Sequence, residues 1–158
     1  MTRTLQLRDI TRENFDAVAC LEVHEHQRGF LASNSYSIAQ ASFNPALRTR
    51  AIYSDGEPVG FAMYCMPEAD DDEPGCYYIW RFMMDRAFQG KGYGRIAMAL
   101  LLEEISGNAD AFEIFISYKP ENDMAKVFYA SFGFVEQGID PDNGEMVAVI
   151  DRRRNLMA

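Results

Sequence analysis

Three closely spaced glycines mark the part of this chain best suited to bind a ligand. They lie in the segment Gln89-Gly90-Lys91-Gly92-Tyr93-Gly94-Arg95. Glycine lets backbone N–H groups turn toward one point and approach a ligand without a Cβ atom in the way. An apolar run at residues 76–84 precedes the segment, and a helical pattern begins near Tyr93. Because that helix would direct the positive end of its dipole at the same point, we predict a site for a phosphate-bearing ligand.

The spacing of the glycines separates the known phosphate-binding motifs. The chain contains no G-x-x-x-x-G-K-[ST] loop. Gly92, Gly94 and Ala97 fit the G-x-G-x-x-A pattern of a dinucleotide fold, with Glu113 near the place of a ribose-binding acid. However, residues 85–90 separate the glycines from the preceding strand, and Glu113 falls inside the next apolar run. Both departures disfavour a dinucleotide site.

Counted from Gln89, the same glycines give Q-x-x-G-x-G. This hexapeptide resembles the pyrophosphate-binding signature, R/Q-x-x-G-x-G/A, of the GNAT superfamily of N-acetyltransferases, which bind acetyl-CoA. Downstream, Asn122, Ala125 and Tyr129 precede Gly133-Phe134. That spacing resembles the N-x-x-A-x-x-x-Y-x-x-x-G-F segment of the same superfamily, and the two segments follow in the family's order.

Three further stretches look closest to bacterial spermine/spermidine (diamine) N-acetyltransferases. They are residues 30–41, residues 78–85 and Gly144-Glu145, and with them the resemblance covers nearly the whole chain. It implies an acetyl-CoA-dependent N-acetyltransferase that acts on a primary amine, with spermidine or spermine as first choice. It also implies direct transfer in a ternary complex and a homodimer.

The resemblance assigns roles to individual residues. The cofactor-binding set is Phe82, Met83, Met84, Gln89, Gly90, Lys91, Gly92, Tyr93, Gly94, Arg95 and Asn122. Tyr129 is expected to protonate the departing thiolate, because a phenol with a pKa near 10 keeps its proton at neutral pH. Alternatively, Tyr129 belongs to an apolar helical stripe with Phe128 and Phe132, and Asn122 simply begins a helix.

The general base is not evident. Many relatives carry a glutamate on the central strand, and Trp80 occupies the matching position. Because tryptophan cannot take a proton at neutral pH, the base is a water relay or another residue, with Glu145, Glu25 and His24 as candidates. Trp80 could instead line the amine channel by cation–π contact, worth about 0.5–2 kcal/mol, or be a buried core indole. The missing glutamate also leaves open a non-catalytic acyl-CoA or polyamine sensor.

The overall charge bears on the substrate. The chain has 158 residues, a net charge of −9 and 48% hydrophobic residues, so we expect one globular N-acetyltransferase domain over residues 1–158. The negative charge disfavours nucleic acid, which requires a basic footprint, and suits a cationic amine. Glu22, Glu25 and Glu145 are candidates to hold its distal ammonium groups. An aminoglycoside or a basic protein N-terminus would fit the charge equally well.

The same composition bears on location and metals. The longest uncharged apolar run, residues 96–102, is too short to span a membrane. No signal peptide is evident, so we expect a cytoplasmic protein. Cys20, Cys65 and Cys76 lack metal-ligand spacing, so we expect no metal, and thiols that are reduced and mostly buried.

Hydrophobic periodicity locates the elements that must position these residues. We expect strands at 3–10, 48–53, 59–66, 77–84, 112–117, 134–137 and 145–150, and helices at 11–23, 35–43, 93–105 and 121–131. Thr11 is the expected N-cap of the first helix. We expect Asp70 to Glu73 to lie in a solvated acidic loop and Arg152 to Arg154 to form an exposed tail. The order predicts an α/β fold, a mixed, mostly antiparallel, twisted GNAT-like sheet with helices on both faces.

Overall fold

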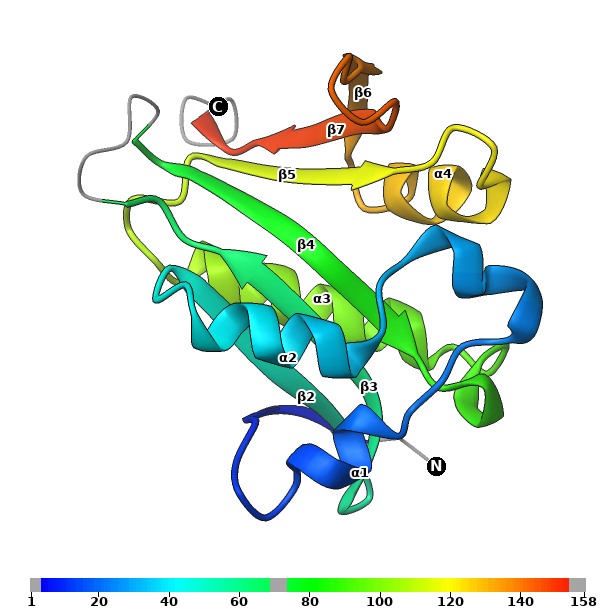
Figure 1. Ribbon diagram of the computed structural model, residues 1–158. Helices are drawn as coiled ribbons and strands as arrows, with labels where there is room; N and C mark the ends of the chain where they lie inside the picture. Colours follow the sequence, from blue (N-terminus) through cyan, green and yellow to red (C-terminus); the bar gives the residue numbers. More distant parts are fainter. Residues whose placement is uncertain (1–3, 69–73, 154–158) are drawn as a thin grey trace.

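A seven-stranded mixed sheet organises the molecule, with strand order β1-β2-β3-β4-β5-β7-β6 (Figure 1). The computed structural model describes residues 4–68 and 74–153. The strands are β1 (Leu5–Asp9), β2 (Leu47–Ser54), β3 (Glu57–Cys65), β4 (Cys76–Met84), β5 (Glu113–Tyr118), β6 (Val135–Ile139) and β7 (Met146–Asp151). The helices are α1 (Phe15–Ala19), α2 (Asn34–Ser42), α3 (Tyr93–Ser106), α4 (Asp123–Ala130) and the 3₁₀ helices η1 (Glu25–Phe30) and η2 (Arg86–Phe88). The order confirms the predicted fold class.

Helices cover both faces of the sheet, because successive side chains of a strand point to opposite sides. On β3, Ala62 and Tyr64 belong to the same core cluster as Leu101 of α3. Phe61 and its neighbours on the other face pack with Val18 of α1. Figure 1 accordingly shows α2 in front of the sheet and α3 behind it.

The sheet opens between β4 and β5, its only parallel pair among the described strands. These strands pair at four positions, from Cys76 with Glu113 to Ile79 with Ile116. Next on β4 is a bulge at Trp80, since Ile79 and Arg81 oppose consecutive residues of β3. Bulges bend a strand, and past this point β4 and β5 diverge (Figure 1). The last part of β4 therefore pairs with β3 alone.

The first helix is much shorter than predicted. The pattern predicted residues 11–23, but α1 covers only Phe15–Ala19, and Asn14 rather than Thr11 precedes it. The chain from residue 20 onward turns away to contact η2, where the backbone N–H of Glu22 donates to Asp85 Oδ1 at 2.8 Å. A tertiary contact thus ends the helix, which local periodicity cannot show.

Of the two described C-terminal arginines, Arg153 is exposed as predicted, whereas Arg152 is half-buried. The N–H of Arg152 donates to the carbonyl of Phe112 at 2.8 Å, and Arg153 pairs with Glu113 at 3.1 Å. Both continue the contacts of β7 with β5. Arg154 and the acidic run from Asp70 to Glu73 lie outside the described residues.

The expectation for the thiols is only partly correct. Cys76 is buried and Cys65 half-buried, but Cys20 is exposed because it follows the short α1 at the surface.

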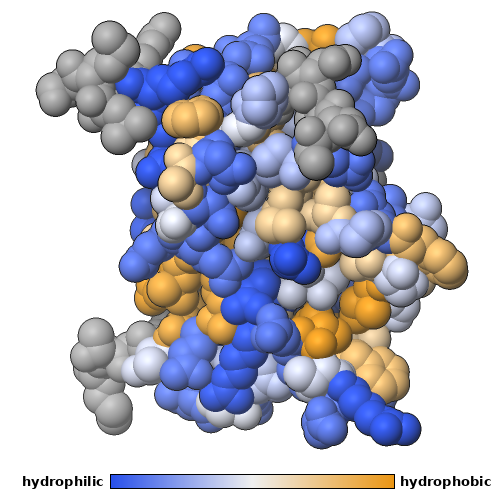
Figure 2. Space-filling view, turned by 90° about the vertical axis from the view of Figure 1, so that its left-hand side faces the viewer, coloured by the Kyte–Doolittle hydropathy of each residue, from blue (hydrophilic) through white to orange (hydrophobic). Residues whose placement is uncertain are grey.

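Figure 2 shows one side of the molecule, where apolar side chains gather in small groups between hydrophilic ones. No helix within residues 4–68 and 74–153 is long and apolar enough to cross a membrane.

Candidate active site

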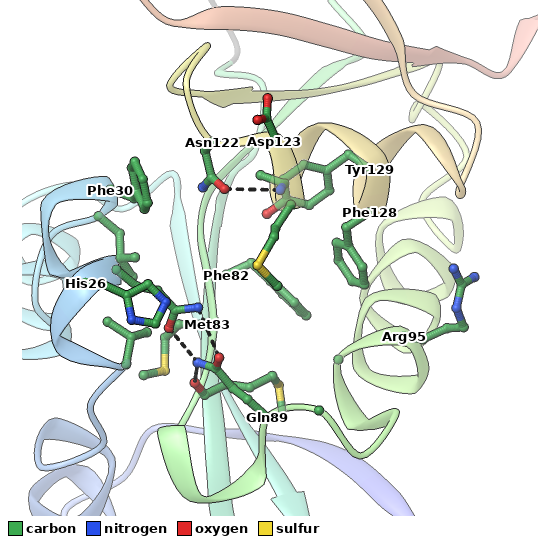
Figure 3. Close-up of a pocket in the computed structure, with 18 of the residues that line it drawn as sticks. His26, Phe30, Phe82, Met83, Gln89, Arg95, Asn122, Asp123, Phe128 and Tyr129 are labelled. Carbon is green, nitrogen blue, oxygen red and sulfur yellow. Dashed lines mark hydrogen bonds between the residues drawn. The ribbon is translucent and has the colours of Figure 1, made fainter.

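A cavity of about 650 Å³ lies where β4 has separated from β5. This volume is typical of small-molecule sites, roughly 300–1,000 Å³. In Figure 3, β4 lies behind the cavity, His26 and Phe30 of η1 lie on one side, and Tyr129 and Arg95 lie on the other. The predicted residues that line it are Phe82, Met83, Met84, Gln89, Gly90, Gly92, Gly94, Arg95, Asn122 and Tyr129. One cavity thus brings together most of the predicted cofactor set and the predicted acid.

The glycine loop forms one end of the cavity. Gly90 and Gly92 have φ of 76° and 83°, a left-handed conformation that side-chain-bearing residues rarely adopt. A Cβ atom added at either position would meet nothing within 4 Å, so backbone conformation, not space, requires these glycines. Gly92 is the N-cap of α3. The first N–H groups of a helix lack intrahelical partners, so an anion at this end of the cavity would meet them.

The edge of β4 supplies backbone groups to the cavity. The N–H of Asp85 donates to the carbonyl of Val59 at 2.8 Å. Because hydrogen-bonded positions alternate along an antiparallel pair, Met83 also bonds to β3, whereas Phe82 and Met84 direct their N–H and C=O groups to the opposite edge. Of the three cofactor-binding residues predicted on β4, we therefore expect Phe82 and Met84, and not Met83, to offer backbone groups to a cofactor. Met83 instead packs its side chain in the core shared with α1.

Gln89 uses its side chain within the protein. Its Nε2 donates to the carbonyl of Met84 at 2.9 Å and to Oε1 of Gln27 at 2.9 Å. Gln27 in turn donates from Nε2 to Gln89 Oε1 at 3.1 Å (Figure 3). The side chain predicted to contact the cofactor therefore fastens the glycine loop to η1, and Gln89 offers a ligand chiefly its backbone.

The two predicted cofactor-binding cations of the loop, Lys91 and Arg95, and their neighbour Tyr93 are placed differently. Arg95 lines the cavity, with its guanidinium 5.0 Å from the centre of the Phe132 ring and a 2.8 Å hydrogen bond to Ser131. Lys91 does not line it, and its Nζ lies 5.9 Å from the centre of the Phe88 ring. Tyr93 also lies outside the cavity lining and packs edge-on against Phe88. Arg95 is thus the predicted cation that the structure places at the cavity.

Tyr129 both packs in the core and borders the cavity. Its ring contacts those of Tyr118, Phe128 and Phe134 at centroid distances of 5.7, 5.3 and 5.9 Å, and it points into the cavity in Figure 3. Burial, and secondarily the neighbouring Tyr118, raises the pKa of its phenol. Its hydroxyl makes no hydrogen bond to residues 4–68 or 74–153. A protonated donor is therefore available at the cavity.

Asn122 is the N-cap of α4. Its Oδ1 accepts a hydrogen bond from the N–H of Ala125 at 3.2 Å. In Figure 3 its amide nitrogen points away from the helix and toward the cavity. The two roles weighed for Asn122 are therefore compatible, because the oxygen caps the helix and leaves the amide as a donor.

None of the residues predicted to hold the amine lines this cavity. Glu22 lines a second cavity of about 380 Å³, which shares Val23, Leu31 and Met83 with the first. Its carboxylate lies 3.2 Å from Arg28. Glu25 of η1 is exposed and lines neither of the two.

Trp80 and Glu145 lie away from both cavities. Trp80 is 38% exposed, so the alternative of a buried core indole is wrong. Burial lowers the pKa of Arg81, and the nearby charge of Glu145 and then Tyr36 partly offsets this effect. The charge of Glu145 thus raises the pKa of Arg81, the residue after Trp80. Glu145 and Trp80 therefore belong to the same region of the molecule.

Sequence analysis missed the wall that η1 contributes. Val23, His26, Gln27, Phe30 and Leu31 line the cavity, and none was predicted there. His24, which was considered as a base, stacks on His26 at a centroid distance of 5.6 Å. The polar run from His24 to Gln27, which follows the predicted helix over residues 11–23, was the available signal, but no local pattern shows that this run turns back to the glycine loop.

Comparison with known proteins identifies the class to which this fold and site belong. The acetyltransferase (GNAT) family matches residues 6–134, and the chain belongs to that family. It is an N-acetyltransferase, and acetyl-CoA is its acetyl donor. This excludes the dinucleotide alternative.

The chain is similar to individual proteins over nearly its whole length. The chain is 30% identical over 148 residues to a spermine/spermidine N(1)-acetyltransferase of Bacillus subtilis strain 168, covering 92% of this chain and 97% of the relative. A probable spermine N(1)-acetyltransferase of Bacillus subtilis subsp. natto matches to the same extent. Among solved structures, an aminoglycoside acetyltransferase in complex with coenzyme A gives a TM-score of 0.78 at 18% identity, over 98% of this chain and 99% of that one.

A spermidine N-acetyltransferase from Vibrio cholerae in complex with CoA and spermine gives a TM-score of 0.74 at 16% identity, over 96% of this chain and 98% of that one. At these identities, both structural likenesses support the fold alone.

The described residues contain no group of three or more His, Cys, Asp or Glu side chains that could hold a metal ion.

Proposed function

We propose that this protein acetylates a polyamine, spermidine or spermine, by direct transfer from acetyl-CoA to a primary amine in a ternary complex. The observation that carries the proposal is the 30% identity, over 92% of the chain, to the Bacillus subtilis spermine/spermidine N(1)-acetyltransferase. The whole chain would act as one domain. We also propose, from family resemblance, a cytoplasmic homodimer, which light scattering and cell fractionation can test.

The donor would lie along the open edge of β4. Acetyl-CoA supplies the acetyl group as an activated thioester. The outward N–H and C=O groups of Phe82 would pair with amide groups of the pantetheine arm, as an added strand does, while the carbonyl of Met84 keeps its bond to Gln89 Nε2. The N–H of Met84 would polarise the thioester carbonyl, and the amide nitrogen of Asn122 would donate to the arm. The glycine loop and Arg95 would bind the pyrophosphate.

Tyr129 would act as the general acid. The amine nitrogen adds to the carbonyl carbon, and as the tetrahedral intermediate collapses the carbon–sulfur bond breaks and the phenol donates its proton to the sulfur. The nitrogen releases a proton as the amide forms, and a proton from solvent restores the phenol, so the protons balance. An ordinary phenol, with a pKa near 10, is already protonated at neutral pH, and burial raises the pKa of Tyr129 further, so the proton that this role requires is present. Its ring contacts with Tyr118 and Phe134 would hold it in place during turnover.

The amine must lose a proton before it attacks. A free alkyl ammonium has a pKa of about 10.4, which near neutral pH costs roughly 4 kcal/mol. His26 is the imidazole that lines the cavity and joins His24, Glu25 and Glu145 as a candidate base, with a water relay as the alternative. Each of these four candidates can be replaced singly and the pH–rate profile measured. If one variant loses the acidic limb of its profile, the replaced residue is the base. If all four variants keep that limb, the water relay is favoured.

The amine would approach from the side of Glu22, and Glu25, Trp80 and Glu145 stay candidates to hold its distal ammonium groups. The cavity beside Glu22 is next to the donor cavity and shares three apolar residues with it. A polyamine ammonium could replace Arg28 as the partner of Glu22, and the exposed face of Trp80 could contact a second ammonium.

Two measurements test the proposal. Calorimetry should show that the intact protein binds CoA, and absence of binding at millimolar CoA would refute the donor site. A screen of polyamines, aminoglycosides and basic peptides, with thiol release as the readout, should give the highest kcat/KM for spermidine or spermine. CoA binding without turnover on any amine would indicate the sensor, and faster turnover of another amine class would refute only the polyamine assignment.

A further inference from the structure

The connection between α1 and α2 forms one wall of the donor cavity with little burial of its own. Most of its side chains between residues 20 and 33 are exposed or half-buried. Val23, Leu31 and three residues of η1 nevertheless line the cavity. Since apolar packing is limited here, the position of this wall depends on its hydrogen bonds to other segments.

The first attachment joins Glu22 to the end of β4. The N–H of Glu22 donates to Asp85 Oδ1 at 2.8 Å, and its carbonyl accepts from the N–H of Arg86 at 2.8 Å. The second carboxylate oxygen of Asp85 accepts from the N–H of Ala87 at 3.1 Å. One carboxylate thus ties the start of the wall to η2, directly before the glycine loop.

The second attachment is the reciprocal pair of Gln27 and Gln89, separated by 62 positions in the sequence. Gln27 Oε1 also accepts from the N–H of His24 at 3.1 Å, and Gln89 Nε2 also donates to the carbonyl of Met84. A carbonyl needs a donor and an N–H needs an acceptor, so these two backbone groups fix which way each amide is turned. The oxygen and the nitrogen of each side-chain amide thus both have hydrogen-bond partners. Only one relative orientation of the two amides makes all of these bonds.

We propose that Gln27 and Gln89 are positioning residues that couple the cofactor loop to the amine-facing wall. CoA bound at the glycine loop restricts the backbone at Gln89, and the pair transmits that restriction to residues 21–31. The wall is then ordered before the amine arrives, so donor binding favours amine binding, and the converse follows by linkage. This inference rests on the proposed function.

Hydrogen exchange with CoA as the only added ligand tests the coupling without knowledge of the amine. In the wild type, CoA should slow amide exchange of residues 84–95 and also slow that of residues 21–31 by about fivefold or more. In Gln27→Leu and Gln89→Leu, where the attachment of Glu22 to Asp85 remains, CoA should slow residues 84–95 as before but slow residues 21–31 clearly less than in the wild type. Gln89→Arg keeps planar donors for Met84 and Gln27 and should retain the effect. Gln137→Leu, at an exposed position of β6, is the matched control.

Steady-state kinetics with spermidine supply the second readout. The two leucine variants should raise KM for the amine on the order of tenfold, while KM for acetyl-CoA changes far less. Their effects should be non-additive in the double variant, because either change alone breaks the pair.

The outcomes separate this inference from the proposed function. Equal CoA protection of residues 21–31 in the wild type and both leucine variants would overturn the inference and leave the acetyltransferase assignment intact. Protection confined to residues 84–95 in the wild type would overturn it as well. Absence of any CoA effect on either segment would overturn the proposed function, and this inference with it.

Discussion

Tyr129 packs in the core with its ring and presents its hydroxyl to the cavity. Its ring packs among Tyr118, Phe128 and Phe134, and its hydroxyl faces the cavity without a hydrogen-bonding partner in the described structure. A side chain that served only to fill the core would not need the hydroxyl. Replacing Tyr129 by Phe therefore isolates the chemical role, because the aromatic packing is kept.

We expect Tyr129→Phe to lower kcat by roughly 10²-fold and to leave CoA affinity nearly unchanged, since a positioned general acid contributes roughly 10²–10⁴-fold. Steady-state kinetics and CoA calorimetry measure the two quantities. Phe128→Leu, a neighbouring ring change that leaves the hydroxyl, is the control for disturbed packing. An unchanged kcat, with chemistry shown to limit the rate, would remove Tyr129 from the mechanism.

The two glycines of the Q-x-x-G-x-G motif, Gly92 and Gly94, differ in backbone conformation. Gly92 has φ of 83°, so Gly92→Ala should destabilise the protein by about 1–2 kcal/mol through backbone strain alone and weaken CoA binding. Gly94 does not have a positive φ, and its added Cβ would lie 3.6 Å from Met84 Cγ, an ordinary contact. Gly94→Ala should therefore fold with unchanged or higher stability. Urea unfolding and CoA calorimetry compare the pair, and equal behaviour would contradict the assigned conformational roles.

At the scale of elements, three buried tyrosines of the sheet donate to carboxylates on α3, on the loop between α3 and β5, and on β6. Tyr64 bonds to Glu104 at 2.8 Å, Tyr77 to Asp110 at 2.8 Å and Tyr118 to Glu136 at 2.7 Å. Burial, followed by the bonded carboxylate, raises the pKa of Tyr77 and Tyr118 to about 12, and Tyr64 is raised in the same way.

These shifts predict alkaline sensitivity. An unfolded tyrosine has a pKa of about 10, so above that pH the unfolded chain releases protons that the folded protein still holds. The stabilisation is complete below pH 10 and should be lost as the pH rises from about 10 to 12. Urea unfolding at several pH values measures this loss, which Tyr118→Phe should reduce and exposed Tyr36→Phe should not. An equal slope in all three proteins would contradict the prediction.

The sequence predicts elements well where their signals are local. The strands flanking Asp55-Gly56, the start of α3 at the glycine loop and the Asn122 cap were all predictable, because alternation, turn residues and caps act over a few residues. The short α1 was not, since the bond of Glu22 to Asp85 ends it. The role of the Gln89 side chain was equally hidden, because its partner, Gln27, is 62 residues away. Long-range polar contacts of this kind leave no periodic pattern.

At the scale of the whole molecule, the net charge of −9 should attract a polycation over distances larger than the site. We expect KM for spermine to rise severalfold between about 0.1 and 1 M salt, where the Debye length falls from about 10 to 3 Å. KM for a simple alkyl monoamine should rise less, because it has no distal charges to lose. Initial-rate kinetics in a salt series test this, and identical salt dependence for both amines would argue against a polyamine substrate.

The divided sheet also bears on how such a protein can diversify. Only four paired positions join the half built from β1 to β4 to the half built from β5 to β7, and each half is continuous in the sequence. Among these positions, Tyr78 stacks on Phe115 at 4.9 Å, away from the glycine loop. The angle between the halves thus depends on this seam and on the core cluster that packs side chains of both halves together, such as Ile79 and Ile114. Selection for a bulkier or slimmer amine can act on this seam and widen or narrow the cleft, while donor recognition stays under separate control.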